Sequence, residues 1–290
     1  MGSQFISVKL DSLPGSNDST QGFTPFAGQV VDSLESWKGQ SVIGLTGKCT
    51  KVTGDVLENQ PIYQVTTLPP RTRVEMQLMI SNLKPLFTAL LCLSILHMAL
   101  PYLGDYLYIR SRENETIVIL SDSWENALPF VQWMLLKNAQ IIVCIPKHED
   151  ESAKKIEWSR HAFFKHPSFK SKSLQVTLRS VNDDEIADNV LKITKYGASA
   201  ILVLGDAFKT EQVKIHRQVL LAAGLGSRVV WCSRMEQIDP CECDCLFDKG
   251  ISLGFFNLDS ILSTESHIGI VQHAIIETVN HMANSTLFVS

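Results

Sequence analysis

The chain has 290 residues, of which 45% are hydrophobic, and this is enough to build a packed core in one large domain or two ordinary ones. Its formal net charge is −4 and charged residues make up 19%, so it lacks the basic excess that follows nucleic-acid phosphates. These values argue against a disordered chain and against a nucleic-acid partner.

The first hundred residues are rich in turns and carry short β-like pieces. The pieces are Phe5 to Leu10, Gln40 to Leu45 and Ile62 to Thr67, with a turn at "LPGSND", Leu13 to Asp18. Short strands bounded by turn residues predict a small β domain over residues 1–100. Met1 to Asp11 lack the charged and then apolar pattern of a secretory signal, which predicts a reducing, cytoplasmic location.

The most apolar segment is "LFTALLCLSILHMALPYL", Leu86 to Leu103. Thr88, Ser94, His97 and Pro101 interrupt it, whereas a membrane-spanning helix wants about 20 predominantly apolar residues. We therefore expect a helix buried in a folded core, and no membrane segment. His97 is interpreted as a core histidine, because no acidic partner can be assigned to it from the sequence.

From residue 101 to residue 290, apolar strand patterns alternate with helix patterns, which is typical of an α/β fold with a doubly wound parallel sheet. The expected strands are Ile117 to Leu120, Ile141 to Ile145, Leu174 to Arg179, Ala200 to Leu204 and Ser227 to Cys232. Between them, helices are expected at Ser152 to Phe164, from Asp183 onward, and at Glu211 to Ala222 with Gly224 as its C-terminal cap. The sequence thus predicts a Rossmann-type domain over residues 101–290, with the strand Ile117 to Leu120 at its centre.

A working dinucleotide site places glycines after the first strand, where they let the backbone approach the pyrophosphate. This chain has "SDSWEN", Ser121 to Asn126, at that place, and it has no glycine between Gly104 and Gly197. Trp124 brings bulk, and Glu125 brings a like charge, to the position where backbone amides would meet phosphate. The pattern predicts that no cofactor binds and that the NADP site is vestigial. A different, phosphate-free ligand in this loop stays open.

Other candidate site residues are few. Lys147 and His148 follow the second strand, where NADP enzymes often carry a cation for the 2′-phosphate, but without the glycine loop they are interpreted as a solvated turn. Asp183 and Asp184 resemble a carboxylate pair, yet they precede a helix and suit its N-terminal cap. The sequence contains no Gly-x-Ser-x-Gly, His-Glu-x-x-His or Gly-Lys-Ser/Thr motif. We therefore assign no catalytic residue and no cofactor-binding residue.

The seven cysteines are Cys49, Cys92, Cys144, Cys232, Cys241, Cys243 and Cys245. An odd count, with Cys92 and Cys144 inside apolar runs, is typical of reduced thiols. "PCECDC", Pro240 to Cys245, has a C-x-C-x-C spacing that fits structural zinc poorly. We expect an acidic surface turn with reduced thiols there, and we assign no metal ligand.

Five segments resemble the enoyl-reductase domain of fungal highly reducing polyketide synthases, a medium-chain dehydrogenase/reductase. They are "IGLTGKCTKVTGD" (Ile43 to Asp55), "VILSDSWENALPFVQWMLLKNAQIIVCIP" (Val118 to Pro146), "YGASAILVLGDAF" (Tyr196 to Phe208), "LGSRVVWCS" (Leu225 to Ser233) and "SLGFFNLDSIL" (Ser252 to Leu262). The resemblance implies a GroES-like substrate-type domain over residues 1–100, followed by the Rossmann-type domain. Thr46 stands where the family has the Glu of a Gly-Leu-Glu turn. With the glycines also lost, the resemblance implies a degenerate form of the domain.

The implied function is a non-catalytic enoyl-reductase-like domain with a structural role beside the other domains of a polyketide synthase. In the family, an edge strand pairs with its two-fold mate, and "ISLGFFNL", Ile251 to Leu258, corresponds to it here. The segment is apolar, with no lysine or proline to blunt the edge, so we expect a homodimer with Phe255 and Phe256 at or beside the contact. The helix that follows should cover the local core with Ile268, Val271, Ile275, Val279 and Met282.

Two enzymatic alternatives stay open. One is an active, divergent NADPH-dependent enoyl reductase or quinone-oxidoreductase-like enzyme, whose loop binds the cofactor through side chains. The other is a Rossmann-type methyltransferase, which would want an acidic residue at the end of the second strand to hold ribose hydroxyls. Pro146 and Lys147 stand there instead and argue against it.

Overall fold

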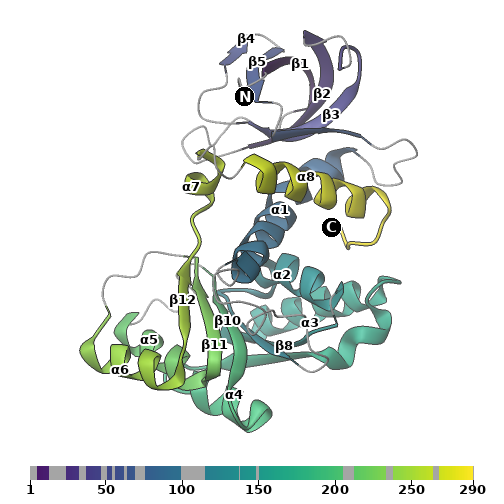
Figure 1. The fold of residues 1–290 in the computed structure, drawn as a ribbon. Helices are drawn as coiled ribbons and strands as arrows, with labels where there is room; N and C mark the ends of the chain where they lie inside the picture. The colour runs from purple at the N-terminus through teal and green to yellow at the C-terminus, as the bar shows by residue number, and fades with distance from the viewer. Residues whose placement is uncertain are drawn as a thin grey trace. The chain divides into compact units, whose positions relative to one another are not determined.

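The computed structural model describes residues 5–12, 24–32, 37–46, 51–53, 56–61, 64–68, 76–98, 115–136, 138–147, 150–204, 212–232, 238–263 and 268–289. Its internal contacts divide the chain into two compact units (Figure 1). The first unit comprises Met1–Leu91 and Leu258–Ser290, and the second unit comprises Cys92–Asn257. This division differs from the predicted domains, because the residues from Leu258 onward join the N-terminal unit and not the Rossmann-type one.

The first unit contains an antiparallel sheet of six strands in the order β4-β5-β1-β2-β3-β6. The strands are β1 (Phe5–Ser12), β2 (Thr24–Asp32), β3 (Ser41–Thr46), β4 (Lys51–Thr53), β5 (Val56–Pro61) and β6 (Val65–Thr67). Their core is built from Val8, Phe26, Val30, Val42 and Val65. All three expected strand regions contain strands, β1, β3 and β6, the last covering Val65–Thr67 of the predicted Ile62 to Thr67, while β2, β4 and β5 were not predicted. The turn "LPGSND" lies outside the described residues.

The helices α7 (Leu258–Ser263) and α8 (Ile268–Ala283) belong to the first unit, as does α1 (Met76–Met98) up to Leu91. The α8 helix buries Val271, Ile275, Val279 and Met282 on one side, as expected, whereas Ile268, which was predicted with them, is only partly buried. It contacts β6 of the antiparallel sheet, which belongs to the same unit. Residues Leu86–Leu93 of α1 are largely buried, and none of the described helices has the length and apolar character needed to cross a bilayer.

The second unit contains a parallel sheet of six strands in the order β12-β11-β10-β7-β8-β9. The strands are β7 (Thr116–Leu120), β8 (Gln140–Pro146), β9 (Val176–Val181), β10 (Ala198–Val203), β11 (Ala223–Trp231) and β12 (Ser252–Phe255). All five predicted strands are present, and the first of them, β7, lies inside the sheet as expected. The order reverses beside β7, so β8 lies on one side of it and β10 on the other. This is the doubly wound arrangement that the sequence predicted.

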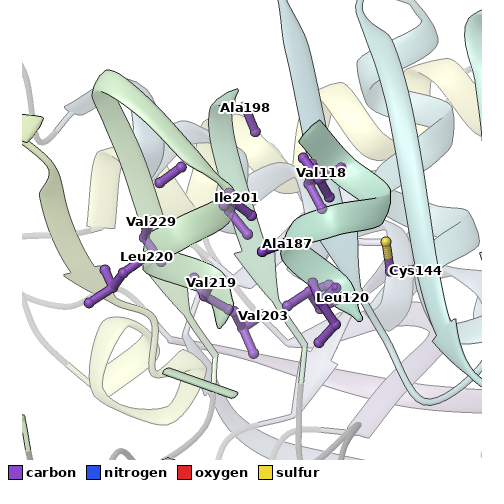
Figure 2. Close-up of a cluster of buried hydrophobic side chains, with 14 of the residues drawn as sticks. Val118, Leu120, Cys144, Ala187, Ala198, Ile201, Val203, Val219, Leu220 and Val229 are labelled. Carbon is purple, nitrogen blue, oxygen red and sulfur yellow. The ribbon is translucent and has the colours of Figure 1, made fainter. Parts of the chain in front are cut away.

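Helices flank both faces of this sheet (Figure 1). They are α2 (Trp124–Leu136), α3 (Asp150–Lys165), the 3-10 helix η4 (Lys170–Gln175), α4 (Ile186–Thr194), α5 (Gln212–Ala222) and α6 (Pro240–Lys249). Val118 and Leu120 of β7 pack with α4 and α5 in one apolar cluster (Figure 2). Because side chains alternate along a strand, Ile119 points to the opposite face, which α2 and α3 cover.

The junction of α5 and β11 differs from the prediction. Gly224 lies inside β11 with no left-handed backbone, so it is not the C-terminal cap of α5. Instead, the Lys249 ammonium of α6 donates to the carbonyl oxygens of Leu220 and Ala223, at 2.8 and 2.9 Å, and thereby satisfies the end of the helix. Lys249 lies 29 and 26 residues beyond these two carbonyls in the chain, so no local pattern could indicate this cap.

Candidate functional site at the carboxyl edge of the parallel sheet

In open α/β sheets, ligands bind outside the carboxyl ends of the strands, where the strand order reverses. In this chain that place is the end of β7, between β10 and β8. The sheet hydrogen bonds continue up to it, because the Leu204 amide donates to Leu120 at 2.9 Å and the Ser121 amide donates to Cys144 at 3.1 Å. The backbone that enters the following turn is therefore fixed on both sides.

The turn from β7 into α2 is hydrogen-bonded to itself. Ser123 is the N-cap of α2, since its carbonyl accepts from the Ala127 amide and its Oγ accepts from the Asn126 amide at 3.2 Å. Asp122 accepts from the Asn126 side-chain amide at 2.8 Å, and from the Ser121 hydroxyl at 3.3 Å. A local side chain thus already occupies one of the amides at the start of the helix.

Trp124 does not obstruct this turn in the way that the sequence predicted. Its side chain is fully buried and packs edge-on against Phe163 of α3, with 6.2 Å between the ring centroids. The bulk that we expected at the phosphate position instead lies in the core between α2 and α3. Its indole N–H is buried and has no hydrogen-bond acceptor among the described residues.

Two features of the turn disfavour a dinucleotide pyrophosphate. Such a group needs free backbone amides and a positive helix end. Here the Asn126 amide is bonded to Ser123, and the carboxylates of Asp122 and Glu125 both lie within the first turn of the helix or directly before it. These two negative charges already offset the positive end of the helix dipole, and they would repel phosphate. Charge and hydrogen bonding oppose the cofactor here, whereas the predicted steric obstruction by Trp124 is absent.

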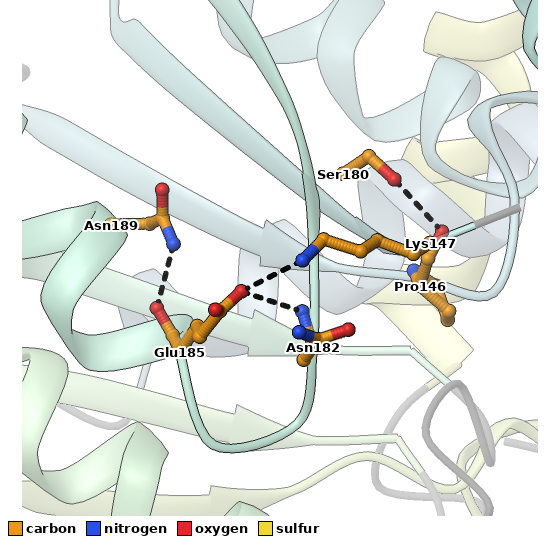
Figure 3. Close-up of polar contacts among 6 residues, drawn as sticks. All are labelled: Pro146, Lys147, Ser180, Asn182, Glu185 and Asn189. Carbon is orange, nitrogen blue, oxygen red and sulfur yellow. Dashed lines mark hydrogen bonds and ion pairs between the residues drawn. The ribbon is translucent and has the colours of Figure 1, made fainter.

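The ends of β8 and β9 are joined by a second polar cluster (Figure 3). The Lys147 ammonium lies 3.1 Å from Oε2 of Glu185, and the Asn182 amide donates to the same oxygen at 3.4 Å. In addition, the Ser180 hydroxyl donates to the Pro146 carbonyl at 3.3 Å. Lys147 is exposed, as expected for a solvated turn, but it is held by an ion pair that the sequence did not predict.

The Lys147–Glu185 pair affects the pKa of the acid. The hydrogen bond from Lys147, followed by that from the Asn182 amide, holds the pKa of Glu185 below its ordinary value. Glu185 is therefore ionised near neutral pH and offsets the charge of Lys147 where a 2′-phosphate would need it. Both side chains are about half exposed, so a strong anionic ligand could still compete for the lysine.

The predicted capping role of Asp183 and Asp184 is wrong. The N-cap of α4 is Glu185, which makes no capping hydrogen bond through its side chain. The Ala187 amide instead donates to the Gln218 side chain of α5 at 2.9 Å. The donor at the helix end is satisfied from a neighbouring helix, so the acidic pair is left in the turn before α4.

The cysteine-rich segment is also different from the prediction, because it begins a helix and not a turn. Asp239 and Glu242 form a capping box around Pro240, which is the first helical residue of α6. This Asp-Pro-x-Glu pattern was readable in the sequence. Cys241 and Cys243 are exposed and Cys245 is half-buried, all as free thiols. Across the described ranges, His, Cys, Asp and Glu side chains nowhere gather in a group of three that could hold a metal ion.

Two candidates of the sequence cannot be placed. The side chain of His97 and the whole of His148 lie outside the described residues. Conversely, the structure brings together two pairs that sequence reasoning missed. These are Lys147 with Glu185, and Cys92 with Cys232, whose sulfurs lie 3.7 Å apart. Both pairs join residues distant in the chain, so local sequence could not reveal them.

The chain thus combines an antiparallel sheet in the first unit with a doubly wound parallel sheet in the second. No protein-family model and no curated protein sequence matches the chain. Solved structures do match it. An alcohol dehydrogenase superfamily protein from Novosphingobium aromaticivorans has a TM-score of 0.67 at 14% identity, with 99% of this chain and 81% of that chain covered.

Two reductases match equally well. The apo form of JamJ enoyl reductase has a TM-score of 0.66 at 13% identity, and 2-haloacrylate reductase has a TM-score of 0.66 at 14% identity. Each comparison covers 99% of this chain and 82% of the other. At these identities the likeness establishes the fold, and the function has to be argued from the site.

Proposed function

We propose that this chain is a non-reducing, enoyl-reductase-like domain with a structural role in a polyketide synthase, located in the cytoplasm. The observation that carries the proposal is the self-bonded turn after β7. Asn126 is held by Ser123 and Asp122, and two carboxylates occupy the helix end that would bind a pyrophosphate. The polyketide synthase context rests on the five sequence segments that resemble such enoyl-reductase domains.

We expect no saturable NADPH binding at concentrations up to about a millimolar, where a retained site would contribute roughly 4 kcal/mol. The physical reason is the repulsion between the pyrophosphate and the side chains of Asp122 and Glu125. Isothermal calorimetry and NADPH fluorescence on the full chain measure this directly. A one-to-one isotherm would refute the non-reducing assignment.

The main alternative is an active, divergent NADPH-dependent reductase, and the exposure of Lys147 is what favours it. In that case Lys147 would leave Glu185 and bind the 2′-phosphate of the cofactor. Lys147→Ala would then weaken NADPH binding and leave NADH binding unchanged. If neither dinucleotide binds the wild type or the variant, the structural role is supported.

The proposed structural role is to hold two copies together through β12, the edge strand of the parallel sheet. Within the described residues, β12 pairs only with β11, so its outer backbone edge is open. Phe255 is 55% exposed on this strand, whereas Phe256 is buried and its amide donates to Trp231. Phe255 is thus available for a contact between copies and Phe256 is not. An open apolar edge of this kind favours strand pairing with a second chain.

We expect the wild type to be a dimer, with twice the 32.3 kDa mass of one chain, and Phe255→Lys to be a folded monomer. A charge on the edge strand opposes pairing with a second copy. Leu253 is left unchanged, because it packs against the core and its replacement would disturb the fold. Light scattering coupled to size exclusion measures the mass.

Phe247→Lys is the matched control for this variant. Phe247 is 86% exposed on α6 and does not lie on the edge strand, so its replacement should leave the dimer intact. A wild type that is monomeric at high concentration, or a Phe255→Lys variant that is still dimeric, would contradict the role of β12.

A further inference from the structure

The carboxyl edge of the parallel sheet carries a pair of thiols in contact. Cys92 lies on α1 and is fully buried, and Cys232 directly follows β11 and is partly exposed. Their sulfurs are 3.7 Å apart although the two residues are 140 positions apart in the chain. Both belong to the second unit. The contact is therefore a product of the fold and not of sequence proximity.

The separation of the two sulfurs is short enough for a bond to form with little rearrangement. A disulfide needs its sulfurs about 2.0 Å apart, so they have to approach by less than about 2 Å. The backbone of Cys232 is held in place, since its amide donates to the Val203 carbonyl at 2.9 Å. The two sulfurs would therefore approach each other through rotation of the side chains and small shifts of α1.

The two thiols differ in their readiness to react. The hydrogen bond with Cys232 and the burial of the thiol raise the pKa of Cys92 well above its ordinary value. Cys92 is consequently a poor first nucleophile. Cys232 is the partner that solvent reaches, so an oxidant meets it first. Cys144 provides a contrast, because it is a free, buried cysteine whose pKa burial raises to about 12.

We propose that Cys92 and Cys232 form a reversible disulfide when the chain meets a low-molecular-weight disulfide such as oxidised glutathione. The Cys232 thiolate attacks one glutathione sulfur, forms a mixed disulfide and releases one glutathione thiolate. Cys92 gives up its proton and attacks the Cys232 sulfur, which releases the second glutathione. Two protein thiols are oxidised, one glutathione disulfide is reduced, and the two protons end on the two glutathione thiols.

The product would be a covalent link between α1 and the end of β11. Disulfides in a reducing compartment are usually transient and redox-sensing, so the pair is a modification site and not a permanent crosslink. The disulfide involves neither the turn after β7 nor the edge strand β12, and only its transient nature rests on the cytoplasmic location proposed above.

The test uses the full chain with Cys241, Cys243 and Cys245 replaced by serine, so that the thiols of α6 do not compete. The folded protein is equilibrated with oxidised and reduced glutathione, quenched with acid, alkylated and digested with trypsin. We expect a crosslinked species that contains Val229 to Arg234 joined to the peptide of Cys92, with a mass about 2 Da below the sum of the two peptides. The link should disappear after treatment with a reducing agent.

Cys232→Ser in the same background is the matched control, and it should give no crosslink to Cys92. As a second measurement, oxidation should raise the melting temperature of the parent by about 5 °C or more and leave that of the control unchanged. Full alkylation of both cysteines after equilibration with oxidised glutathione would overturn the proposal. So would a mixed disulfide at Cys232 that never transfers to Cys92 in the folded protein.

Discussion

Replacing Gly197 by alanine should lower the free energy of unfolding of the second unit by about 3 kcal/mol or more, the sum of backbone strain and overpacking. Gly197 precedes β10 and has a φ of +92°, a conformation that side chains disfavour. A Cβ there would lie 2.5 Å from the Gly224 nitrogen and 2.7 Å from the Ala223 carbonyl carbon. These are backbone atoms of β11, so relief would require the two strands to separate.

Urea denaturation followed by tryptophan fluorescence measures this loss. Trp124, Trp133, Trp158 and Trp231 all belong to the second unit, and only Trp37 belongs to the first. The fluorescence transition therefore reports mainly on the unit that contains the substitution.

Gly226→Ala is the control for the Gly197 substitution. Gly226 also has a positive φ, of +66°, but a Cβ there would meet no atom within 4 Å. Its replacement by alanine introduces the backbone strain without the clash, and should lower the free energy of unfolding by about 1 kcal/mol. If both variants lost the same stability, the close approach of Gly197 to β11 would not be the cause.

The sequence predicted the parallel sheet well because its strands are buried on both faces. Such strands are continuous apolar runs, such as Ile141 to Ile145, and they can be recognised without knowledge of their neighbours. The strand β2 was missed, although it contributes Phe26 and Val30 to the core, since Gly28 and Gln29 break its apolar pattern. Strands of an antiparallel sheet have a weaker apolar pattern in the sequence, and they are recognised only together with the strands that pair with them.

The candidate site was predicted only in part, because its geometry depends on contacts between distant segments. The absence of glycines after β7 was visible in the sequence, as was the acidic character of the turn. However, the direction of the Trp124 side chain depends on Phe163, and the state of Lys147 depends on Glu185. Local sequence shows which residue types are present and does not show whether they face the cleft or the core.

The burial of the Trp124 side chain predicts a second large effect on stability. Trp124→Ala should lower the free energy of unfolding by about 3 to 5 kcal/mol, because truncating a buried aromatic side chain leaves a cavity. The indole is fully buried and in edge contact with Phe163, which itself stacks on Phe169 at 4.7 Å. The lost contacts would therefore loosen α2, α3 and the segment before η4 together. Urea denaturation followed by far-UV circular dichroism measures the change without depending on the removed fluorophore.

Trp124→Phe separates packing from hydrogen bonding at this position. Phenylalanine keeps an aromatic ring against Phe163 and removes a buried N–H for which the described residues offer no acceptor. We expect a loss below about 1.5 kcal/mol, since part of the volume is retained. A loss of unfolding free energy under about 1 kcal/mol for Trp124→Ala would contradict the packing of the indole between α2 and α3. The side chain would then be free to obstruct a phosphate at this turn, as the sequence predicted. The expected result would show that Trp124, the first residue of α2, is needed for core packing. Replacing it with a glycine, as in a dinucleotide-binding loop, would then leave a cavity in the core.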